Sequence, residues 1–417
     1  MKKRLVLLLL TALLCSCSDT GESVSHELIL ADNSGIPSQI KLNRTYIAAK
    51  SDNKTSDEPD KLNFTEQKGV WISYIDLYDM LYNKTEAQFE EAFDNACKNC
   101  RNIGTNTLYV HVRAFGDAFY HSSYYQFTKT AGESCDYDPL EIMTAISHKN
   151  GLSIHAWINP YRCETPELIS GNDDYRISYW YHTDNDRIKL IDSDGHLWLD
   201  PAYEDVRQLI LDGIAEIIDN YDIDGIHFDD YFYPTTDTWF DSISFENSGQ
   251  TELSDFRRDN VNKLVKAAYE LIKEKNKNIL FGISPQGNID NNINEMYADV
   301  YKWCSETGYI DYILPQIYFG FQNPVLPFDE CADKWSRLKT NNNVSLVIGL
   351  AVYKLYSEDE YQSDSGILAK QIAFAKGIDG YSGYALYNYS SLYPTEPDKA
   401  EYAGLVIENI IKEKGGS

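Results

Sequence analysis

The chain has 417 residues, with 64 acidic and 37 basic side chains and a formal net charge of −27. Nucleic acids and anionic membrane surfaces are bound by clustered lysine and arginine, so this balance argues against either as the main partner. A neutral or cationic glycan as partner, or simple solubility outside the cell, is compatible with it.

The N-terminus has the pattern of an export signal. Three basic residues at 2–4 precede the apolar run 5–14, which is too short to span a bilayer but suits a signal peptide. The run closes with Leu-Cys-Ser-Cys at 14–17, which resembles the lipobox of bacterial lipoproteins with Cys17 as the lipidated residue. We therefore expect removal of residues 1–16 and a lipid anchor on the extracytoplasmic side of a bacterial membrane. Cleavage with release of the chain is the alternative.

Residues 17–65 are rich in Ser, Asp, Asn, Lys and Thr, which is typical of a tether. No later stretch reaches about 18 consecutive apolar residues, so we expect the rest of the chain to be soluble. Six cysteines follow Cys17, and Cys97 and Cys100 have no second Cys-x-x-Cys pair, which argues against a zinc site. The sequence does not decide whether two of the six form a disulfide in an oxidising compartment.

From residue 66 the pattern predicts one α/β domain over 66–412 and a short tail at 413–417. Apolar runs predict strands at 69–75, 107–113, 153–162, 226–228, 279–288, 309–318, 345–353 and 380–388. Amphipathic segments predict helices at 86–102, 139–149, 203–221, 254–275 and 399–414. Parallel strands need crossover connections, and helices must cover the outer face, so eight such units predict a (β/α)8 barrel.

The fourth predicted strand, 226–228, ends in two adjacent carboxylates, Asp229 and Asp230, followed by aromatic residues. Barrel enzymes carry their catalytic groups at the carboxyl ends of strands. Strand alternation places His227, Asp229 and Tyr231 on one side, so we expect Asp229 to face the barrel mouth as nucleophile or base. Asp230 either reaches the site from the loop or binds backbone amides and fixes the turn. A purely structural acidic turn is the alternative for the pair.

Seven motifs follow one another in chain order. They are Gly-Val-Trp at 69–71, Val-Arg-x-x-Gly-Asp-Ala at 112–118, His-Ala-Trp-x-Asn-Pro at 155–160, Leu-Asp-Pro at 199–201, Asp-Gly-Ile-His-Phe-Asp-Asp-Tyr-Phe-Tyr-Pro at 224–234, Ile-Ser-Pro at 283–285 and Pro-Gln-Ile-Tyr at 315–318. Together they resemble the glycosyl-hydrolase-like family ten of bacterial proteins, over roughly residues 66–412. The resemblance implies a TIM-type barrel and glycoside hydrolysis. It also implies a link to peptidoglycan glycan strands for some members, whereas the substrates of most are unsettled.

Glycosidases typically use two carboxyl groups, one to protonate the leaving oxygen and one to attack the sugar or activate water. Asp117, just past the second strand, is the best partner outside the main motif. Arg113 could hold it in a bidentate pair, which would lower its pKa and suit a nucleophile. A structural Arg113–Asp117 pair at the barrel rim is an equal alternative.

The catalytic acids of amylase-like and chitinase-like barrels have no counterpart at the matching positions of this sequence. The fifth strand ends in Ser-Pro-Gln at 284–286, where amylase-like barrels carry a glutamate. In a chitinase-like alignment Tyr231 takes the place of the acid, and a phenol with a pKa of about 10 is a poor proton donor.

The remaining strand ends carry amide, hydroxyl and aromatic groups that suit sugar recognition. The residues expected to bind substrate are Arg113, Asn159, His227, Tyr231, Gln316, Tyr318 and Tyr387. His155 and Trp157 share a strand face with Asn159 but lie deep enough to belong to the core.

The eight histidines show no metal spacing, and Asp192-Ser-Asp194 lacks the downstream glutamate of a calcium loop. We therefore expect neither a metal nor a cofactor, which also argues against a metal-dependent deacetylase. The sequence as a whole predicts a lipid-anchored glycoside hydrolase that acts on a bacterial or dietary polysaccharide by carboxylate catalysis, with Asp229 central. A non-catalytic glycan-binding lipoprotein on the same barrel is the alternative, because no obvious proton donor stands out.

Overall fold

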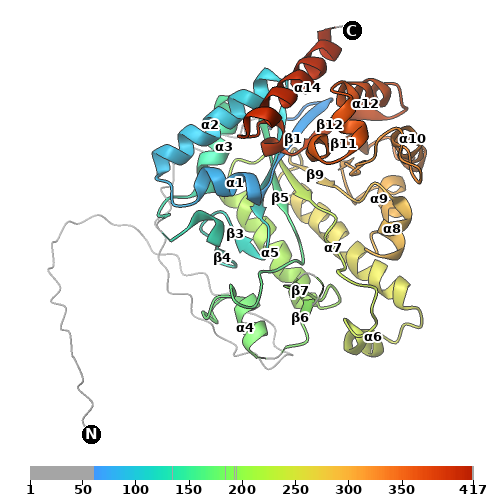
Figure 1. The fold of residues 1–417 in the computed structure, drawn as a ribbon. Coiled ribbons are helices and arrows are strands. Elements are labelled where there is room, and N and C mark those ends of the chain that lie inside the picture. Colours follow the sequence, from blue (N-terminus) through green and yellow to red (C-terminus); the bar gives the residue numbers. More distant parts are fainter. Residues whose placement is uncertain (1–60, 134, 184, 192, 194, 416–417) are drawn as a thin grey trace, which may run out of the picture. The chain divides into compact units, whose positions relative to one another are not determined.

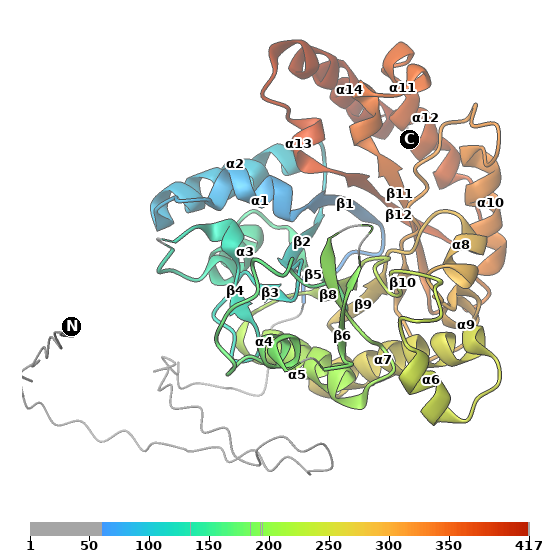
Figure 2. The ribbon, with the colours of Figure 1, turned by 60° about the horizontal axis from the view of Figure 1, so that its bottom comes forward.

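A computed structural model describes residues 61–133, 135–183, 185–191, 193 and 195–415. In this part of the chain eight parallel strands close into a barrel, joined edge to edge in chain order. They are β1 (Gln67–Ile72), β2 (Thr107–Arg113), β5 (Ser153–Ile158), β8 (Gly225–Phe228), β9 (Leu280–Ile283), β10 (Tyr312–Ile313), β11 (Ser345–Ala351) and β12 (Tyr381–Tyr387) (Figure 1). Helices surround the ring of strands (Figure 2). Each strand overlaps a predicted one, so the predicted (β/α)8 barrel is confirmed.

Two of the crossover helices, α2 (Glu86–Asn102) and α3 (Pro139–Lys149), begin at side chains that bind their first free amide groups. Thr85 and Gln88 form a capping box at the start of α2, and Asp138 caps α3. Both helices have the predicted bounds. The other long helices are α5 (Glu204–Asn220), α7 (Leu253–Lys275), α10 (Phe328–Leu338), α12 (Ile367–Lys376) and α14 (Pro397–Gly415).

Short elements decorate the loops, and the sequence patterns did not predict them. They are α1 (Tyr74–Leu81), α4 (Arg176–His182), α6 (Ser242–Ser248), α8 (Ile289–Asn294), α9 (Val300–Ser305), α11 (Asp359–Ser363), α13 (Tyr389–Leu392), the 3-10 turns Lys129–Ala131 and Val352–Tyr356, the pair β3 (Asp117–Ala118) and β4 (Gln126–Phe127), and the antiparallel pair β6 (Ile188–Ile191) and β7 (His196–Leu199). Most lie in segments that follow barrel strands, at the end of the barrel where function is expected.

Aromatic side chains fill the inside of the barrel. The inner cluster consists of Trp71, Tyr109, Trp157, Tyr312, Leu314, Val347 and Ala385. Glycines make room for it: a Cβ at Gly282 would lie 2.1 Å from the Tyr312 ring, and one at Gly69 would lie 2.4 Å from Tyr109. The barrel interior is therefore a packed core, and free space remains only at its mouth.

The six cysteines of the described residues are all free thiols, and five of them are buried. Cys97 and Cys100 lie on α2 and pack in the core, and burial raises the pKa of the Cys97 thiol to about 12. The disulfide that the sequence left open is not formed, and these thiols act as small apolar groups.

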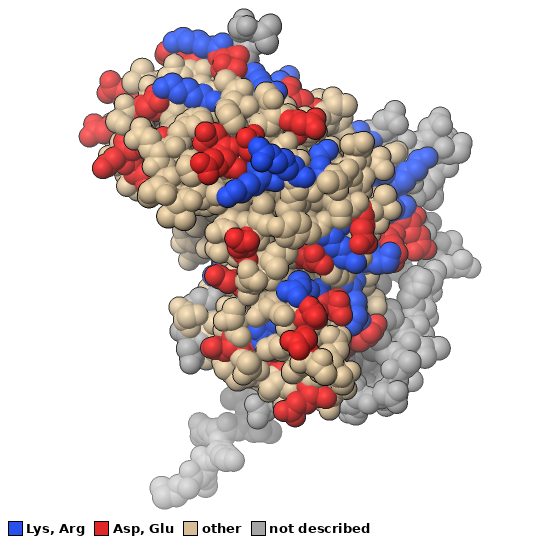
Figure 3. All heavy atoms as spheres, turned by 90° about the vertical axis from the view of Figure 1, so that its right-hand side faces the viewer, with Lys and Arg blue, Asp and Glu red and all other residues tan. Residues whose placement is uncertain are grey.

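Acidic and basic side chains are interspersed on the face of the molecule that Figure 3 shows, without an extended basic patch there. None of the helices in the described ranges has the length and apolarity that crossing a membrane requires. The predicted signal peptide and Cys17 lie outside the described residues.

Asp224 ties together the end of the barrel opposite the mouth. Its carboxylate accepts hydrogen bonds from the Leu62 amide at 2.7 Å, from the Ile154 amide at 2.9 Å and from His148 Nε2 at 2.8 Å. The first aspartate of the main motif is therefore structural. Hydrogen bonds to Asp222 and Asp224 raise the pKa of His148 from 6.5 to about 9.

Folding should therefore become less favourable at alkaline pH. The pKa of His148 is higher in the folded state than in the unfolded state, so its stabilisation is fully present below pH 6.5 and is lost as the pH rises through 9. We expect the melting temperature to fall between about pH 7 and pH 10, and to fall less steeply in His148→Gln. Equal slopes for the two proteins would contradict this assignment.

Candidate active site

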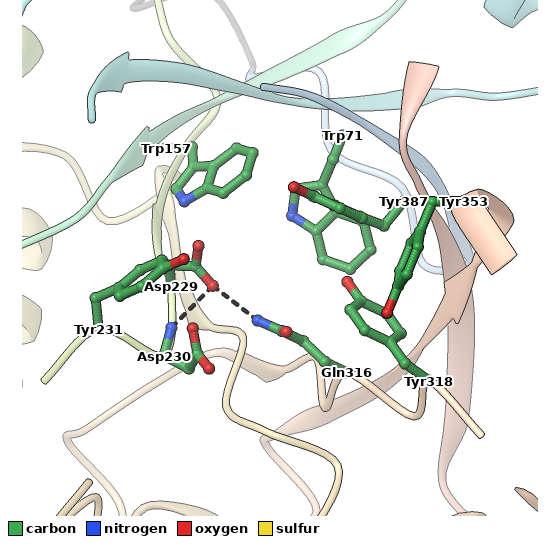
Figure 4. A pocket seen from close by; sticks show the side chains of 9 residues that line it. All are labelled: Trp71, Trp157, Asp229, Asp230, Tyr231, Gln316, Tyr318, Tyr353 and Tyr387. Carbon is green, nitrogen blue, oxygen red and sulfur yellow. Dashed lines mark hydrogen bonds between the residues drawn. The ribbon is translucent and has the colours of Figure 1, made fainter. Parts of the chain in front are cut away.

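A pocket opens at the carboxyl ends of the barrel strands. Its volume is about 280 Å³, close to the lower limit of about 300–1,000 Å³ that is usual for small-molecule sites. Six strands or the segments after them supply its lining, which consists of Trp71, Trp157, Asp229, Asp230, Tyr231, Gln316, Tyr318, Tyr353 and Tyr387 (Figure 4). The structure thus brings together six of the residues that the sequence predicted.

Asp229 and Asp230 follow β8 directly and are the acidic residues of this lining. Oδ1 of Asp229 accepts a hydrogen bond from the Asp230 amide at 2.9 Å and another from Gln316 Nε2 at 2.7 Å. Gln316 Nε2 also donates to the Ser284 carbonyl at 3.1 Å, which fixes the amide group. One oxygen of Asp229 is thus held by the protein on the floor of the pocket, as the dashed lines in Figure 4 show.

The two carboxyl groups cannot easily be ionised together. Burial, with the charge of Asp230 as a second cause, raises the pKa of Asp229 well above its usual range. Burial also raises the pKa of Asp230, although hydrogen bonds from Asp229, Gln286 and Gln316 oppose the rise. Such a pair titrates as a unit and holds a proton at a pH where an ordinary aspartate has lost it.

Three tyrosines line the side of the pocket that faces the acid pair. The rings of Tyr318 and Tyr387 are stacked at 5.8 Å, and Tyr353 meets both edge to face at 5.8 and 6.0 Å. Trp71 continues this wall, 5.8 Å from Tyr387. Within the described ranges no side-chain hydrogen bond engages the three hydroxyls, so they remain available to a ligand.

Trp157 forms the opposite wall and is held from behind. His111 stacks on it with a centroid separation of 3.3 Å, and the indole nitrogen donates to Asn159 Oδ1 at 3.2 Å. Asn159 Nδ2 in turn donates to the Ala114 carbonyl at 3.1 Å. Asn159, which the sequence predicted as a sugar ligand, lies behind Trp157 and acts on the pocket through it.

His227 also lies below the pocket and has no exposed side-chain surface. Trp71 Nε1 donates to its Nε2 at 3.2 Å, and its Nδ1 lies 2.9 Å from the Tyr312 hydroxyl, which lies 2.9 Å from Nδ1 of His155. The Trp71 indole can only donate, so Nε2 of neutral His227 accepts and the His227 proton is on Nδ1. Nδ1 of His227 therefore donates to the Tyr312 hydroxyl, which donates to Nδ1 of His155. His227 therefore orients Trp71 and does not reach the substrate space.

Arg113 and Asp117 lie away from the pocket. A register shift between β2 and β5 at His111 to Arg113 turns the Arg113 side chain outward, where its guanidinium lies 4.4 Å from the Tyr125 ring centroid. Oδ1 of Asp117 accepts hydrogen bonds from two amides of its own turn, at 3.1 and 2.9 Å. Within the described ranges the two side chains form no ion pair, and neither lines the site.

The loop 229–241, which carries both acids, is clamped by Arg257 of α7. Its guanidinium makes a fully buried bidentate pair with Asp241, at 2.8 and 2.6 Å. It also donates to the backbone carbonyls of Asp237 at 2.7 Å and Thr235 at 3.2 Å. Four hydrogen bonds to three points of the loop fix its path beyond the acid pair.

Three residues of the lining were not predicted as ligands: Trp71, Trp157 and Tyr353. Only Tyr353 stands at the end of its predicted strand, whereas the strands that carry Trp71 and Trp157 end earlier than predicted, at Ile72 and Ile158. Trp157 was assigned to the core, and the other two had no role. Only 2% of Trp71 and 3% of Trp157 is exposed, so both belong to core and pocket wall at once. In the described ranges no group of three or more His, Cys, Asp and Glu side chains could hold a metal ion.

A family model and the most similar proteins both relate this chain to glycosyl hydrolases. The family model Glycosyl hydrolase-like 10 matches residues 66–365. The chain is 31% identical to glycosyl hydrolase YngK of Bacillus subtilis strain 168 over 355 residues, which cover 78% of this chain and 69% of that protein. It is 27% identical to glycosyl hydrolase DigH of Escherichia coli K12 over 383 residues, which cover 80% and 85% of the two chains.

Solved structures show the same fold at much lower identity. The PgaB (BpsB) glycoside hydrolase domain from Bordetella bronchiseptica has a TM-score of 0.56 and 10% sequence identity, covering 82% of this chain and 99% of that domain.

Removing the clamp should cost more stability than removing an exposed ion pair. Arg257→Ala leaves a buried carboxylate at Asp241 without its partner, so we expect a loss of about 3–5 kcal/mol in the free energy of unfolding, measured with urea. The neighbouring Arg258→Ala removes only a surface pair with Asp255 and should cost less than about 1 kcal/mol. Similar losses in the two variants would show that Arg257 is not the clamp.

Proposed function

The chain belongs to the glycosyl hydrolase-like 10 family and is a glycoside hydrolase, and we propose that the pocket around Asp229 and Asp230 cleaves the glycosidic bonds of a polysaccharide outside the cytoplasm. The observation that carries this proposal is a pair of adjacent carboxyl groups, one buried and one half-buried, between aromatic walls at the carboxyl ends of the barrel strands, both with raised pKa values.

The acid pair supplies the proton that bond cleavage requires. A leaving sugar oxygen needs a donor that is still protonated near neutral pH, and burial provides this by raising the pKa of both carboxyl groups. Once the proton has gone to the leaving oxygen, the pair is a base that can take a proton from water.

The walls of the pocket suit a pyranose ring. Trp157 and Trp71 offer aromatic faces or edges to the C–H groups of a sugar, and the hydroxyls of Tyr318, Tyr353 and Tyr387 can bind its hydroxyls. Candidate substrates are peptidoglycan glycan strands and other bacterial or dietary polysaccharides. The net charge of −27 favours neutral or cationic polymers over acidic ones.

Loss of either acid should abolish cleavage without unfolding the protein. We expect Asp229→Asn and Asp230→Asn each to lower kcat about 10²- to 10⁴-fold in an assay of reducing ends released from peptidoglycan strands, chitosan and neutral α- and β-glucans. In the wild type, the rate should fall as the pH rises through the raised pKa of the pair, because the donor is then deprotonated.

Asp290→Asn is the matched control, since it makes the same change at an exposed position of α8. It should leave the rate unchanged. Binding of one glycan by the wild type without cleavage of any would overturn the catalytic proposal.

The location of the enzyme is a separate proposal, which rests on the leader-like residues 1–16 and Cys17. In a bacterial host the full chain should fractionate with membranes and be released by detergent. Cys17→Ser removes the thiol that would carry the lipid, so this variant should leave the membrane fraction. An unchanged distribution would contradict lipidation at Cys17.

A further inference from the structure

We propose that the nucleophile of the reaction is the 2-acetamido group of the substrate itself, so that the pocket is specific for N-acetylated 2-amino sugars. This inference rests on the glycosidase function proposed above and adds its substrate class and its first chemical step.

The argument begins with the spacing that other glycosidase mechanisms need. Two carboxyl groups that flank a glycosidic bond lie about 5–5.5 Å apart when one of them attacks the sugar, and about 6.5–9.5 Å apart when one activates water. In both cases the anomeric carbon and its oxygen lie between the two groups. A site of this kind therefore needs carboxyl groups on two sides of the sugar.

The acid pair does not meet this requirement. Asp229 and Asp230 are consecutive in the chain, and both carboxyl groups lie on the same side of the pocket (Figure 4). The amide of Asp230 also binds Oδ1 of Asp229. The pair is thus one proton-sharing unit on one side of the pocket, with no room between its members for a sugar carbon.

The facing side of the pocket offers no second carboxyl group. It is built by residues of β1, β12 and the segments after β10 and β11, all of which lie in described ranges, and it presents Trp71, Tyr318, Tyr353 and Tyr387 (Figure 4). These four side chains cannot attack a sugar as a carboxylate does.

Asp76 lies close enough to Tyr387 to act on it electrostatically, but its oxygens are engaged elsewhere. They accept hydrogen bonds from Ser73, from Asn388 Nδ2 at 3.0 and 3.1 Å and from the Ser390 amide at 2.8 Å. Asp76 joins the ends of β1 and β12 behind the pocket and does not line it.

The substrate can supply the missing group. The carbonyl oxygen of a 2-acetamido substituent lies within reach of the anomeric carbon of its own ring. A carboxylate that accepts the acetamide N–H would orient this substituent. Asp229 is well placed to do so, because it is the first residue after β8 and two donors to Oδ1 hold it on the pocket floor. Asp230 is more exposed than Asp229 and is left to act on the leaving oxygen.

The proton can move within the pair when substrate binds. In the free enzyme burial favours one shared proton. A hydrogen bond from the acetamide N–H to Asp229 favours its ionised form, which leaves the proton on Asp230. Binding of the correct substrate would thus prepare the acid.

The two steps balance. In the first, the acetamide oxygen bonds to the anomeric carbon, the glycosidic C–O bond breaks, and Asp230 gives its proton to the leaving oxygen. The product is a cyclic oxazolinium ion whose N–H faces the Asp229 carboxylate. In the second, water bonds to the anomeric carbon and gives a proton to Asp230. The bond between the anomeric carbon and the oxazolinium oxygen breaks, which restores the acetamide. Two displacements at one carbon retain its configuration.

The test compares substrates that differ only in the acetyl group. Peptidoglycan glycan strands and chitin oligosaccharides would be offered to the wild type before and after chemical de-N-acetylation, and the anomeric configuration of fresh products would be read by NMR. We expect cleavage of an N-acetylated substrate, retained configuration, no cleavage after de-N-acetylation, and inhibition by the thiazoline analogue of N-acetylglucosamine, which mimics the oxazolinium ion.

Two variants separate the roles of the acids. With an N-acetylated substrate that carries a 4-methylumbelliferyl leaving group, protonation is hardly needed, so the loss of about 10²- to 10⁴-fold expected for Asp230→Asn on a natural glycan should largely disappear. The loss in Asp229→Asn should persist, because orientation of the acetamide is still required. Asp290→Asn remains the control.

Cleavage of de-N-acetylated or neutral glycans at a comparable rate, or inverted products, would overturn this inference and leave the glycosidase function standing. Absence of cleavage of any glycan by the folded wild type would overturn both.

Discussion

The buried pair between Arg257 and Asp241 is the contact on which the rest of the site depends. The strand β8 ends at Phe228, so the backbone hydrogen bonds of the barrel do not reach the loop that follows. Arg257 replaces them with hydrogen bonds to a side chain and to carbonyl groups of that loop. Desolvating a guanidinium in this position is unfavourable, and the penalty is offset because each of its contacts holds part of the loop. Because Arg257 fixes this loop, the two acids at its start are held in the pocket and do not pack against the barrel wall.

Much of the fold and two thirds of the residues that line the pocket follow from simple patterns in the sequence. Apolar runs of strand length alternate with amphipathic segments, and eight such units suit a closed parallel barrel covered by helices. Because the carboxyl ends of parallel strands meet, the polar and aromatic residues that follow these strands come together. This reasoning predicted Asp229, Asp230, Tyr231, Gln316, Tyr318 and Tyr387, all of which line the pocket.

The remaining residues depend on geometry that no residue pattern displays. By strand alternation the side chain of Arg113 should face the inside of the barrel, but the register shift beside it turns this side chain outward. His227 lies beneath Trp71, and Asn159 lies behind Trp157, so neither side chain reaches the pocket. The depth of a residue in a barrel is set by strand stagger and by the size of its neighbours, such as the Tyr312 ring over Gly282, and these are tertiary properties.

The layer of histidines beneath the pocket has a consequence for its electrostatics. Burial lowers the pKa of His155 to about 4 and those of His111 and His227 well below the usual 6.5. All three rings therefore stay uncharged in mildly acidic surroundings, where an ordinary histidine would become a cation. These three rings therefore add no positive charge beneath the pocket when the medium becomes mildly acidic, and of the groups that line the pocket the acid pair is the one that responds to the pH. An enzyme of this design would keep its ligand preference as the pH of its surroundings changes.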